Sequence, residues 1–102
     1  MANQGHSQKN GAITVKNMGD LIVRAKIQYQ FNNSVYERSS DPLSLNQEYT
    51  FLIPIGSSGV FIKIQTVNSI SSKYIYENVF QSFENVCIKV TGTIYQAFVS
   101  NC

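Results

Sequence analysis

The sequence has little charge, no tryptophan and a single histidine, and these shortages exclude several classes of protein. Charged residues make up 14% of the 102 residues, and the net charge is +2. Because affinity for a phosphate backbone depends on clustered lysine and arginine, the scattered basic residues do not predict a nucleic-acid partner. No apolar run approaches the roughly 20 residues of a membrane-spanning helix. Residues 1–11 also lack the hydrophobic segment of a signal peptide.

The chemical groups of an enzyme are scarce as well. A hydrolytic triad needs a base that takes the proton of its nucleophile, and the one histidine, His6, lies in residues 1–11. We expect that segment to be a mobile tail, which cannot hold a catalytic geometry. The acidic residues form no motif, and no cysteine or histidine spacing fits a metal site. The Gly-rich turn at residues 56–59 lacks the lysine of a phosphate-binding loop. The sequence predicts a protein that is not an enzyme and needs no cofactor.

Apolar residues that recur at every second position run through the middle of the chain and predict β-strands. Within residues 48–67 they stand on either side of a Gly-Ser-Ser-Gly break: Tyr49, Phe51 and Ile53 before it, and Val60, Ile62 and Ile64 after it. The longest alternation is Leu21, Val23, Ala25, Ile27, Tyr29 and Phe31, with basic and amide side chains between them. One apolar and one polar face are typical of an antiparallel strand that is half solvated.

Turn signals at intervals of roughly ten residues separate about seven such segments, with no convincing helix, which is typical of an antiparallel β-sandwich. We therefore predict an all-β, immunoglobulin-like sandwich in a single domain at residues 12–102. A small closed barrel is the alternative. Residues 39–47 predict a loop that Leu43 and Leu45 hold against the core. In the later strand at residues 74–80, Tyr74 and Tyr76 share one parity.

Two cysteines, Cys87 and Cys102, are far enough apart to close a short loop and tie down the C-terminal residue. Such a bridge would contribute roughly 3 kcal/mol in the chain-entropy model. Two cysteines do not define a secreted disulfide framework, so a bridge and two unreactive thiols remain alternatives. Asn32 begins an Asn-Asn-Ser sequon on an expected turn. Whether it is glycosylated depends on an export route that the sequence does not define.

Four motifs occur in the order of a known domain. Residues 19–27 are similar to an opening Gly-x-Tyr-Val-Ala strand, and residues 51–54 to a strand that ends in Val-Ile-Pro. Residues 61–64, Phe-Ile-Lys-Ile, match an Ile-x-Ile-Lys strand, and residues 88–95 are similar to a closing strand with Trp-Gly-Thr-Thr-Leu-Tyr. Over about four-fifths of its length the chain resembles the C-terminal, membrane-binding β-sandwich domain of the thiol-activated (cholesterol-dependent) cytolysins.

The resemblance implies membrane docking through loops at one end of the sandwich. One family loop falls here at residues 66–76, and the family's sterol-recognising Thr-Leu pair falls at Thr93 and Ile94. The first loop departs from the family because it has no tryptophan and no cysteine, which leaves Ile70, Tyr74 and Ile75 to insert into lipid. Indoles favour the membrane interface, so their loss favours a polar ligand over a sterol. The family's pore-forming domains have no counterpart in this sequence, so we do not expect the chain to perforate membranes unaided.

We therefore predict a non-enzymatic recognition module that binds a cell-surface glycan or a membrane lipid headgroup, because tyrosine offers a flat apolar face together with a hydroxyl. The alternatives are sterol-dependent membrane binding and a structural protein that forms a homo-oligomer through exposed strand edges. We expect an extracellular or cell-surface location, with the cytoplasm left open. The candidate ligand-binding residues are Asn68, Ser69, Ile70, Lys73, Tyr74, Tyr76, Thr93, Ile94 and Tyr95.

Overall fold

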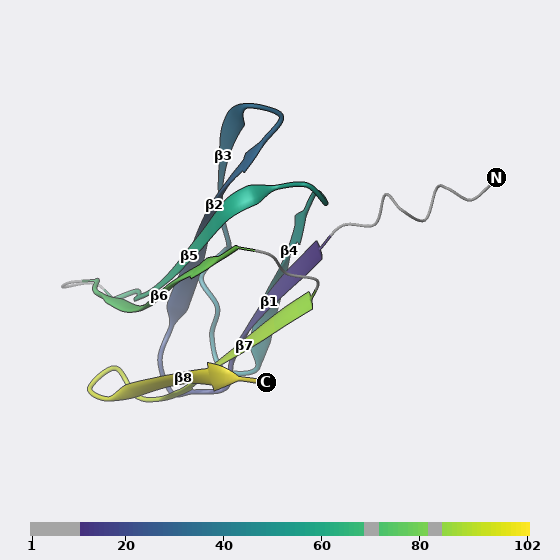
Figure 1. Cartoon of the computed structure of the whole chain (residues 1–102). Helices are drawn as coiled ribbons and strands as arrows, with labels where there is room; N and C mark the ends of the chain where they lie inside the picture. Colours follow the sequence, from purple (N-terminus) through teal and green to yellow (C-terminus); the bar gives the residue numbers. More distant parts are fainter. Residues whose placement is uncertain (1–10, 69–71, 82–84) are drawn as a thin grey trace.

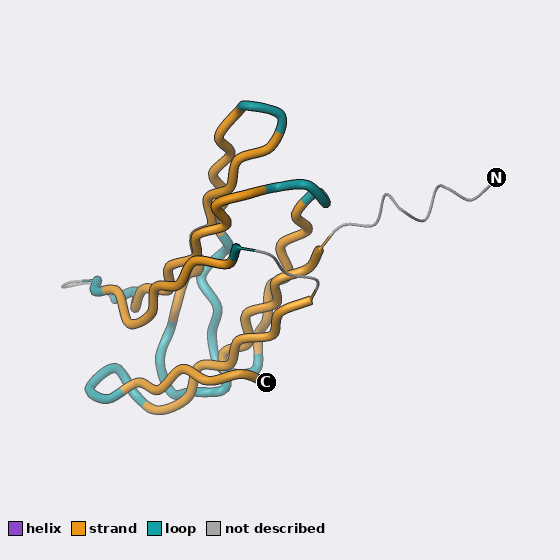
Figure 2. The backbone as a smooth tube through the Cα atoms, in the orientation of Figure 1, coloured by secondary structure: helices purple, strands orange, loops and turns teal. Residues whose placement is uncertain are grey.

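A computed structural model describes residues 11–68, 72–81 and 85–102 and shows two β-sheets packed face to face (Figure 1). The described ranges contain no helix, and Figure 2 shows strands joined by short loops. One sheet has the strand order β4-β1-β7-β8 and the other β3-β2-β5-β6, so the predicted all-β sandwich is confirmed. The strands are β1 (Gly11–Asn17), β2 (Val23–Phe31), β3 (Ser34–Ser39), β4 (Gln47–Ile53), β5 (Ser58–Thr66), β6 (Tyr74–Phe80), β7 (Asn85–Gly92) and β8 (Ala97–Asn101).

The core lies between the sheets and contains the inward-facing side chains of the central strands. The alternation in β2 and β5 is confirmed, since every second residue is buried along most of each strand. Leu43 is buried, as expected, and holds the β3–β4 connection to the core, but Leu45 is 55% exposed, so that half of the prediction was wrong. The buried apolar residues are Ile13, Val15, Val23, Ala25, Ile27, Tyr29, Leu43, Phe51, Ile53, Val60, Ile62, Ile64, Ile88 and Val90.

Strand pairing adds two features that the local pattern did not indicate. β1 pairs antiparallel with β4 but parallel with β7, because a hydrophobic alternation specifies a face and not a neighbour. The described chain has eight strands where turn spacing predicts about seven. The additional strand is β8, which is short and carries the half-exposed Phe98 on its outward side. The described residues include no helix of the length and apolarity that crossing a bilayer requires.

The β2–β3 hairpin turns at Asn32 and Asn33, which have φ values of 53° and 64°. Two successive left-handed residues make the type of two-residue turn that matches the twist of the strands. The tolerance of asparagine for this conformation, which predicted the turn, is confirmed. Tyr29 and Tyr36 stack across the hairpin with ring centroids 5.4 Å apart. In Figure 1 the hairpin projects beyond the neighbouring sheet, at the end opposite the β5–β6 and β7–β8 connections.

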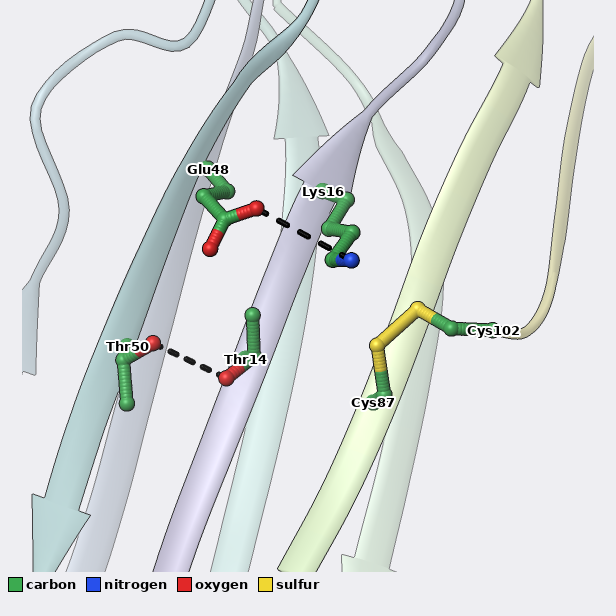
Figure 3. The surroundings of a disulfide bond; sticks show 6 residues. All are labelled: Thr14, Lys16, Glu48, Thr50, Cys87 and Cys102. Atoms are coloured by element: carbon green, nitrogen blue, oxygen red, sulfur yellow. Dashed lines mark hydrogen bonds and ion pairs between the residues drawn. A yellow bond between two sulfur atoms is a disulfide. The ribbon is translucent and has the colours of Figure 1, made fainter.

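A disulfide joins Cys87 of β7 to Cys102, the residue that follows β8 (Figure 3). The backbone N–H of Cys102 also donates to the carbonyl of Cys87 at 3.1 Å. Of the two alternatives for the cysteines, the bridge is therefore the one that the structure contains. Figure 3 also shows the polar outward contacts of β1 with β4, namely Thr14 with Thr50 and Lys16 with Glu48.

Removing the disulfide should destabilise the fold. We expect the double substitution Cys87→Ser and Cys102→Ser to lower the free energy of unfolding by about 3 kcal/mol, because the bridge closes a 15-residue separation in the unfolded chain. Urea denaturation of the two proteins measures the difference. A reducing agent should weaken the parent by a similar amount and leave the double variant unchanged. A loss below about 1 kcal/mol would show that the bridge adds little to the stability that the pairing of β8 with β7 already provides.

Candidate functional site at the loop end

Asn17, the last residue of β1, organises one end of the sandwich. Its side chain is fully buried, and its amide group donates to the carbonyls of Leu21 at 2.6 Å and Leu43 at 2.8 Å. Its Oδ1 accepts the backbone N–H of Gly19 at 2.9 Å. Each of these backbone groups would lose a partner if the amide were absent. Asn17 therefore sets the course of residues 18–22, which connect β1 to β2.

Residues 18–22 join the two loops in which the predicted ligand-binding residues lie. The backbone N–H of Asp20 donates to the carbonyl of Gly92 at 2.8 Å, at the start of the β7–β8 connection. The N–H of Val67, at the start of the β5–β6 connection, donates to the carbonyl of Ile22 at 2.9 Å. Figure 1 shows both connections at the same end of the molecule. We call this end, which comprises residues 18–22, 67–68, 72–73 and 93–96, the loop end.

The β7–β8 connection is a closed turn that presents one tyrosine. The backbone groups of Thr93 and Gln96 bond to each other at 3.0 and 3.1 Å, and Thr93 Oγ1 accepts the N–H groups of Tyr95 and Gln96 at 3.2 and 3.3 Å. Gly92 enters the turn at a φ of 94°, and a Cβ there would collide with the Gln96 carbonyl oxygen. Tyr95 is consequently held at the tip of the turn with 92% of its surface exposed. Ile94 beside it is half-buried.

The base of the β5–β6 connection is also fixed. The backbone N–H of Thr66 donates to the carbonyl of Lys73 at 2.8 Å, and the N–H of Lys73 donates to Thr66 Oγ1 at 3.2 Å. Thr66 is buried, whereas Asn68 and Lys73 are exposed. Ser69 and Ile70, both predicted to bind ligand, lie outside the described residues.

A β-bulge separates Tyr74 from Tyr76. β5 pairs with β6 so that Ile64 faces Tyr76 and Gln65 faces Tyr74, with a register shift between the two pairs. Tyr76 therefore lies on the inward face and packs against the core, while its hydroxyl accepts the amide of the exposed Asn78 at 3.0 Å. Tyr74 lies on the outward face. Tyr74 and Tyr76 share one parity in the sequence but lie on opposite faces, because a bulge adds a residue to one strand and reverses the alternation.

The loop end thus contains five of the predicted residues: Asn68, Lys73, Thr93, Ile94 and Tyr95. Sequence reasoning missed Met18 and Ile22, which are 47% and 42% exposed at the same end. The sequence did contain a signal for Ile22. It is an apolar residue at a position where the alternation of the following strand predicts a polar, outward-facing one. In the described part of the loop end the charged residues are Asp20 and Lys73. No group of three or more potential metal-binding side chains occurs among the described residues.

This architecture is the fold of the C-terminal domain of the cytolysins. The membrane-binding domain of pneumolysin superimposes with a TM-score of 0.72 at 13% identity, over 92% of this chain and 96% of that domain. The cytotoxin suilysin from Streptococcus suis gives 0.71 at 14% identity, over 93% of this chain. A pneumolysin structure described as a sugar-binding protein gives 0.68 at 13% identity, over 91% of this chain. The chain spans 23% of the length of each of these two toxins.

The fold that the four sequence motifs implied is therefore confirmed. These matches are to a membrane-binding domain of a toxin and not to an enzyme fold. Comparison of the sequence with protein-family models gave no match, and comparison with curated proteins gave none either.

Asn17→Ala should destabilise the protein by about 2 kcal/mol or more. The substitution leaves the carbonyls of Leu21 and Leu43 and the N–H of Gly19 without their partner, and each buried unsatisfied group costs about 1–3 kcal/mol. Thermal and urea unfolding measure the loss. Asn101→Ala, at an exposed position of β8, is the matched control and should change stability by less than about 0.5 kcal/mol. Equal effects of the two substitutions would contradict the role given to Asn17.

Proposed function

We propose that this chain is a non-enzymatic recognition module that docks on membrane surfaces through its loop end. The observation that carries the proposal is Tyr95, which a rigid turn holds at the tip of the sandwich with 92% of its surface exposed. A ring in that position has no packing role in the described fold. Tyrosine is favoured at the boundary of lipid and water, where its ring meets the apolar phase and its hydroxyl stays hydrated.

Exposed aliphatic side chains at the same end support shallow insertion. Met18 and Ile22 come from the segment that hydrogen-bonds to both predicted loops. With one acidic and one basic residue in its described part, the loop end has no strong field, so docking should depend little on anionic lipids. The similarity in fold to the membrane-binding domain of pneumolysin supports a membrane as the target. The disulfide is consistent with an extracellular or cell-surface location, because such bonds persist in oxidising compartments.

We further propose that a lipid headgroup or a cell-surface glycan, rather than a deeply inserted sterol, is the ligand at this end. Lys73 and Tyr95 are both exposed and offer an ammonium and a hydroxyl. Ile94, at the position of the family's sterol-recognising pair, is half-buried, and the hydroxyl of Thr93 already accepts two backbone N–H groups of its turn. The pair therefore offers less apolar surface for a sterol than Tyr95 offers for a headgroup.

Tyr95→Ala should weaken binding to phosphatidylcholine vesicles by about tenfold. Loss of the ring removes roughly 1.5 kcal/mol of apolar burial, which corresponds to one decade in the dissociation constant. Co-sedimentation with vesicles measures binding, and circular dichroism verifies the fold. Tyr36→Ala, in the hairpin at the opposite end, is the control and should bind normally. Unchanged binding of folded Tyr95→Ala would remove the loop end from the proposal, whereas binding that requires cholesterol in the vesicles would favour the sterol alternative.

Self-assembly is the second candidate function, and the exposed edge strand β3 favours it. All six residues of Ser34–Ser39 are exposed, including Val35 at 61%. An open edge offers unpaired backbone groups to another chain, although charged side chains such as Glu37 and Arg38 discourage such pairing.

We expect a monomer in multi-angle light scattering across protein concentrations, because the charges on β3 oppose edge pairing. A defined oligomer that Val35→Lys dissociates, and that ignores vesicles, would replace membrane docking by assembly as the function. Gln30→Lys, at an exposed position of the adjacent strand β2, is the matched control for the added charge.

A further inference from the structure

The outward face of the β3-β2-β5-β6 sheet contains a pocket that is separate from the turn that carries Tyr95. Its cavity volume is about 180 Å³. Outward side chains of β2, β3 and β5 and the first residue of β6 line it, among them Lys26, Glu37, Ser39, Phe61, Lys63 and Tyr74, and Ile27, Gln28 and Arg38 complete the lining. The bulge in the β5–β6 pairing is what places Tyr74 on this face. The pocket is thus a product of the pairing of distant strands.

Two lysines face each other in this pocket. Lys26 of β2 and Lys63 of β5 are direct partners in the antiparallel register. Like charges that stand opposite each other destabilise a strand pair. Across the described ranges, neither ammonium group has a carboxylate oxygen within 4.0 Å. The rings of Tyr74 and Phe61 instead hold the Lys63 ammonium, with its Nζ at 4.9 and 5.5 Å from their centroids.

The other sheet contains an internal comparison. Lys16 of β1 and Lys89 of β7 are also register partners. There, however, a carboxylate reaches the pair, because Glu48 of β4 lies 3.9 Å from the Lys16 ammonium. The Lys16–Lys89 pair therefore has a carboxylate of the chain beside it, whereas the Lys26–Lys63 pair in the pocket has none within 4.0 Å among the described residues.

Two carboxylates of the β3-β2-β5-β6 sheet lie near the Lys26–Lys63 pair but form no ion pair with it. Glu37 lines the pocket, and Glu77 is the register partner of Lys63, yet neither makes an ion pair with a described lysine. The carboxylate oxygens of Glu37 remain acceptors for ligand hydroxyls. Ser39 adds a hydroxyl that can donate or accept. Such a mixture of basic, carboxylate and hydroxyl groups suits a ligand that carries negative charge together with several hydroxyls.

We propose that this pocket binds the carboxylate of an acidic sugar between Lys26 and Lys63. The sugar hydroxyls would bond to Glu37 and Ser39, while Tyr74 and Phe61 form the apolar wall and keep the Lys63 ammonium in place. The cavity is smaller than the roughly 300–1,000 Å³ of sites for drug-sized ligands, so it accommodates one sugar unit. The site goes beyond membrane docking, because Tyr95 does not contribute to it.

Titration with defined sugars, followed by the backbone amide signals in NMR, tests the proposal. The ligands are methyl glucuronide and N-acetylneuraminic acid, each with its neutral methyl ester as the control, and inorganic phosphate. We expect at least one acid to shift the amides of Lys26, Ser39 and Lys63 and to bind at least tenfold more tightly than its ester. If neither acid exceeds its ester, or if phosphate binds as tightly as the acids, the proposal is overturned. The phosphate result would point to a simple anion or lipid headgroup site.

Substitutions separate the pocket from the rest of the protein. Lys26→Gln and Lys63→Gln should each weaken binding of the acidic sugar at least tenfold. Lys26→Gln should do so without lowering the melting temperature, because it removes a like-charge contact, whereas Lys63→Gln also loses the two ring contacts of its ammonium. Lys89→Gln on the other sheet is the matched control and should bind the sugar normally. Tyr95→Ala should weaken vesicle binding and keep binding of the acidic sugar in the pocket, so failure of one proposal is distinguishable from failure of the other. Normal sugar binding by both pocket variants would contradict the assignment.

Discussion

Burial of one wall of each sheet against the other is the constraint on which the rest of this structure depends. In β5, Val60, Ile62 and Ile64 are completely inaccessible, and the matching wall of β1 supplies Ile13 and Val15. Because side chains alternate along a strand, filling the core in this way forces every intervening residue outward. The stability of the fold therefore depends on the inward-facing residues of the strands. The residues of the outer faces and the loops can change in chemistry without loss of the core.

Hydrogen bonds hold the loop end together, whereas burial of apolar side chains holds the two sheets together. Asn17 converts the end of β1 into an anchor for residues 18–22, and that segment in turn bonds to the starts of both neighbouring connections. The backbone of the β7–β8 turn is held by its own bonds, so Tyr95 is presented with little freedom to move away. A side chain held in place loses less conformational entropy on binding than one on a mobile loop.

Local patterns in the sequence predicted the strands, the asparagine turn and the loops of the candidate site, and they failed where a single residue changed the register. Leu45 has the spacing of a buried residue but is exposed, because only Leu43 pairs with Val23 across an isolated bridge. Tyr74 and Tyr76 share a parity in the sequence, yet the bulge opposite Ile64 and Gln65 sends them to opposite faces. Met18 was missed because a connection has no periodicity from which to infer exposure, whereas Ile22 could have been recognised as an apolar residue at a position of the alternation that is otherwise polar.

The sequence by itself determined which residues of the central strands β2 and β5 face the core, that the surface carries little charge, and that the fold resembles the cytolysin domain. Those properties follow from alternation, composition and short motifs, each of which is local. Only the tertiary structure decided that β1 runs parallel to β7, that residues 18–22 join two distant loops, and that Lys26 faces Lys63 while Lys16 has Glu48 beside it. Contacts of this kind depend on the register between strands far apart in the chain, which the packing of the whole core selects.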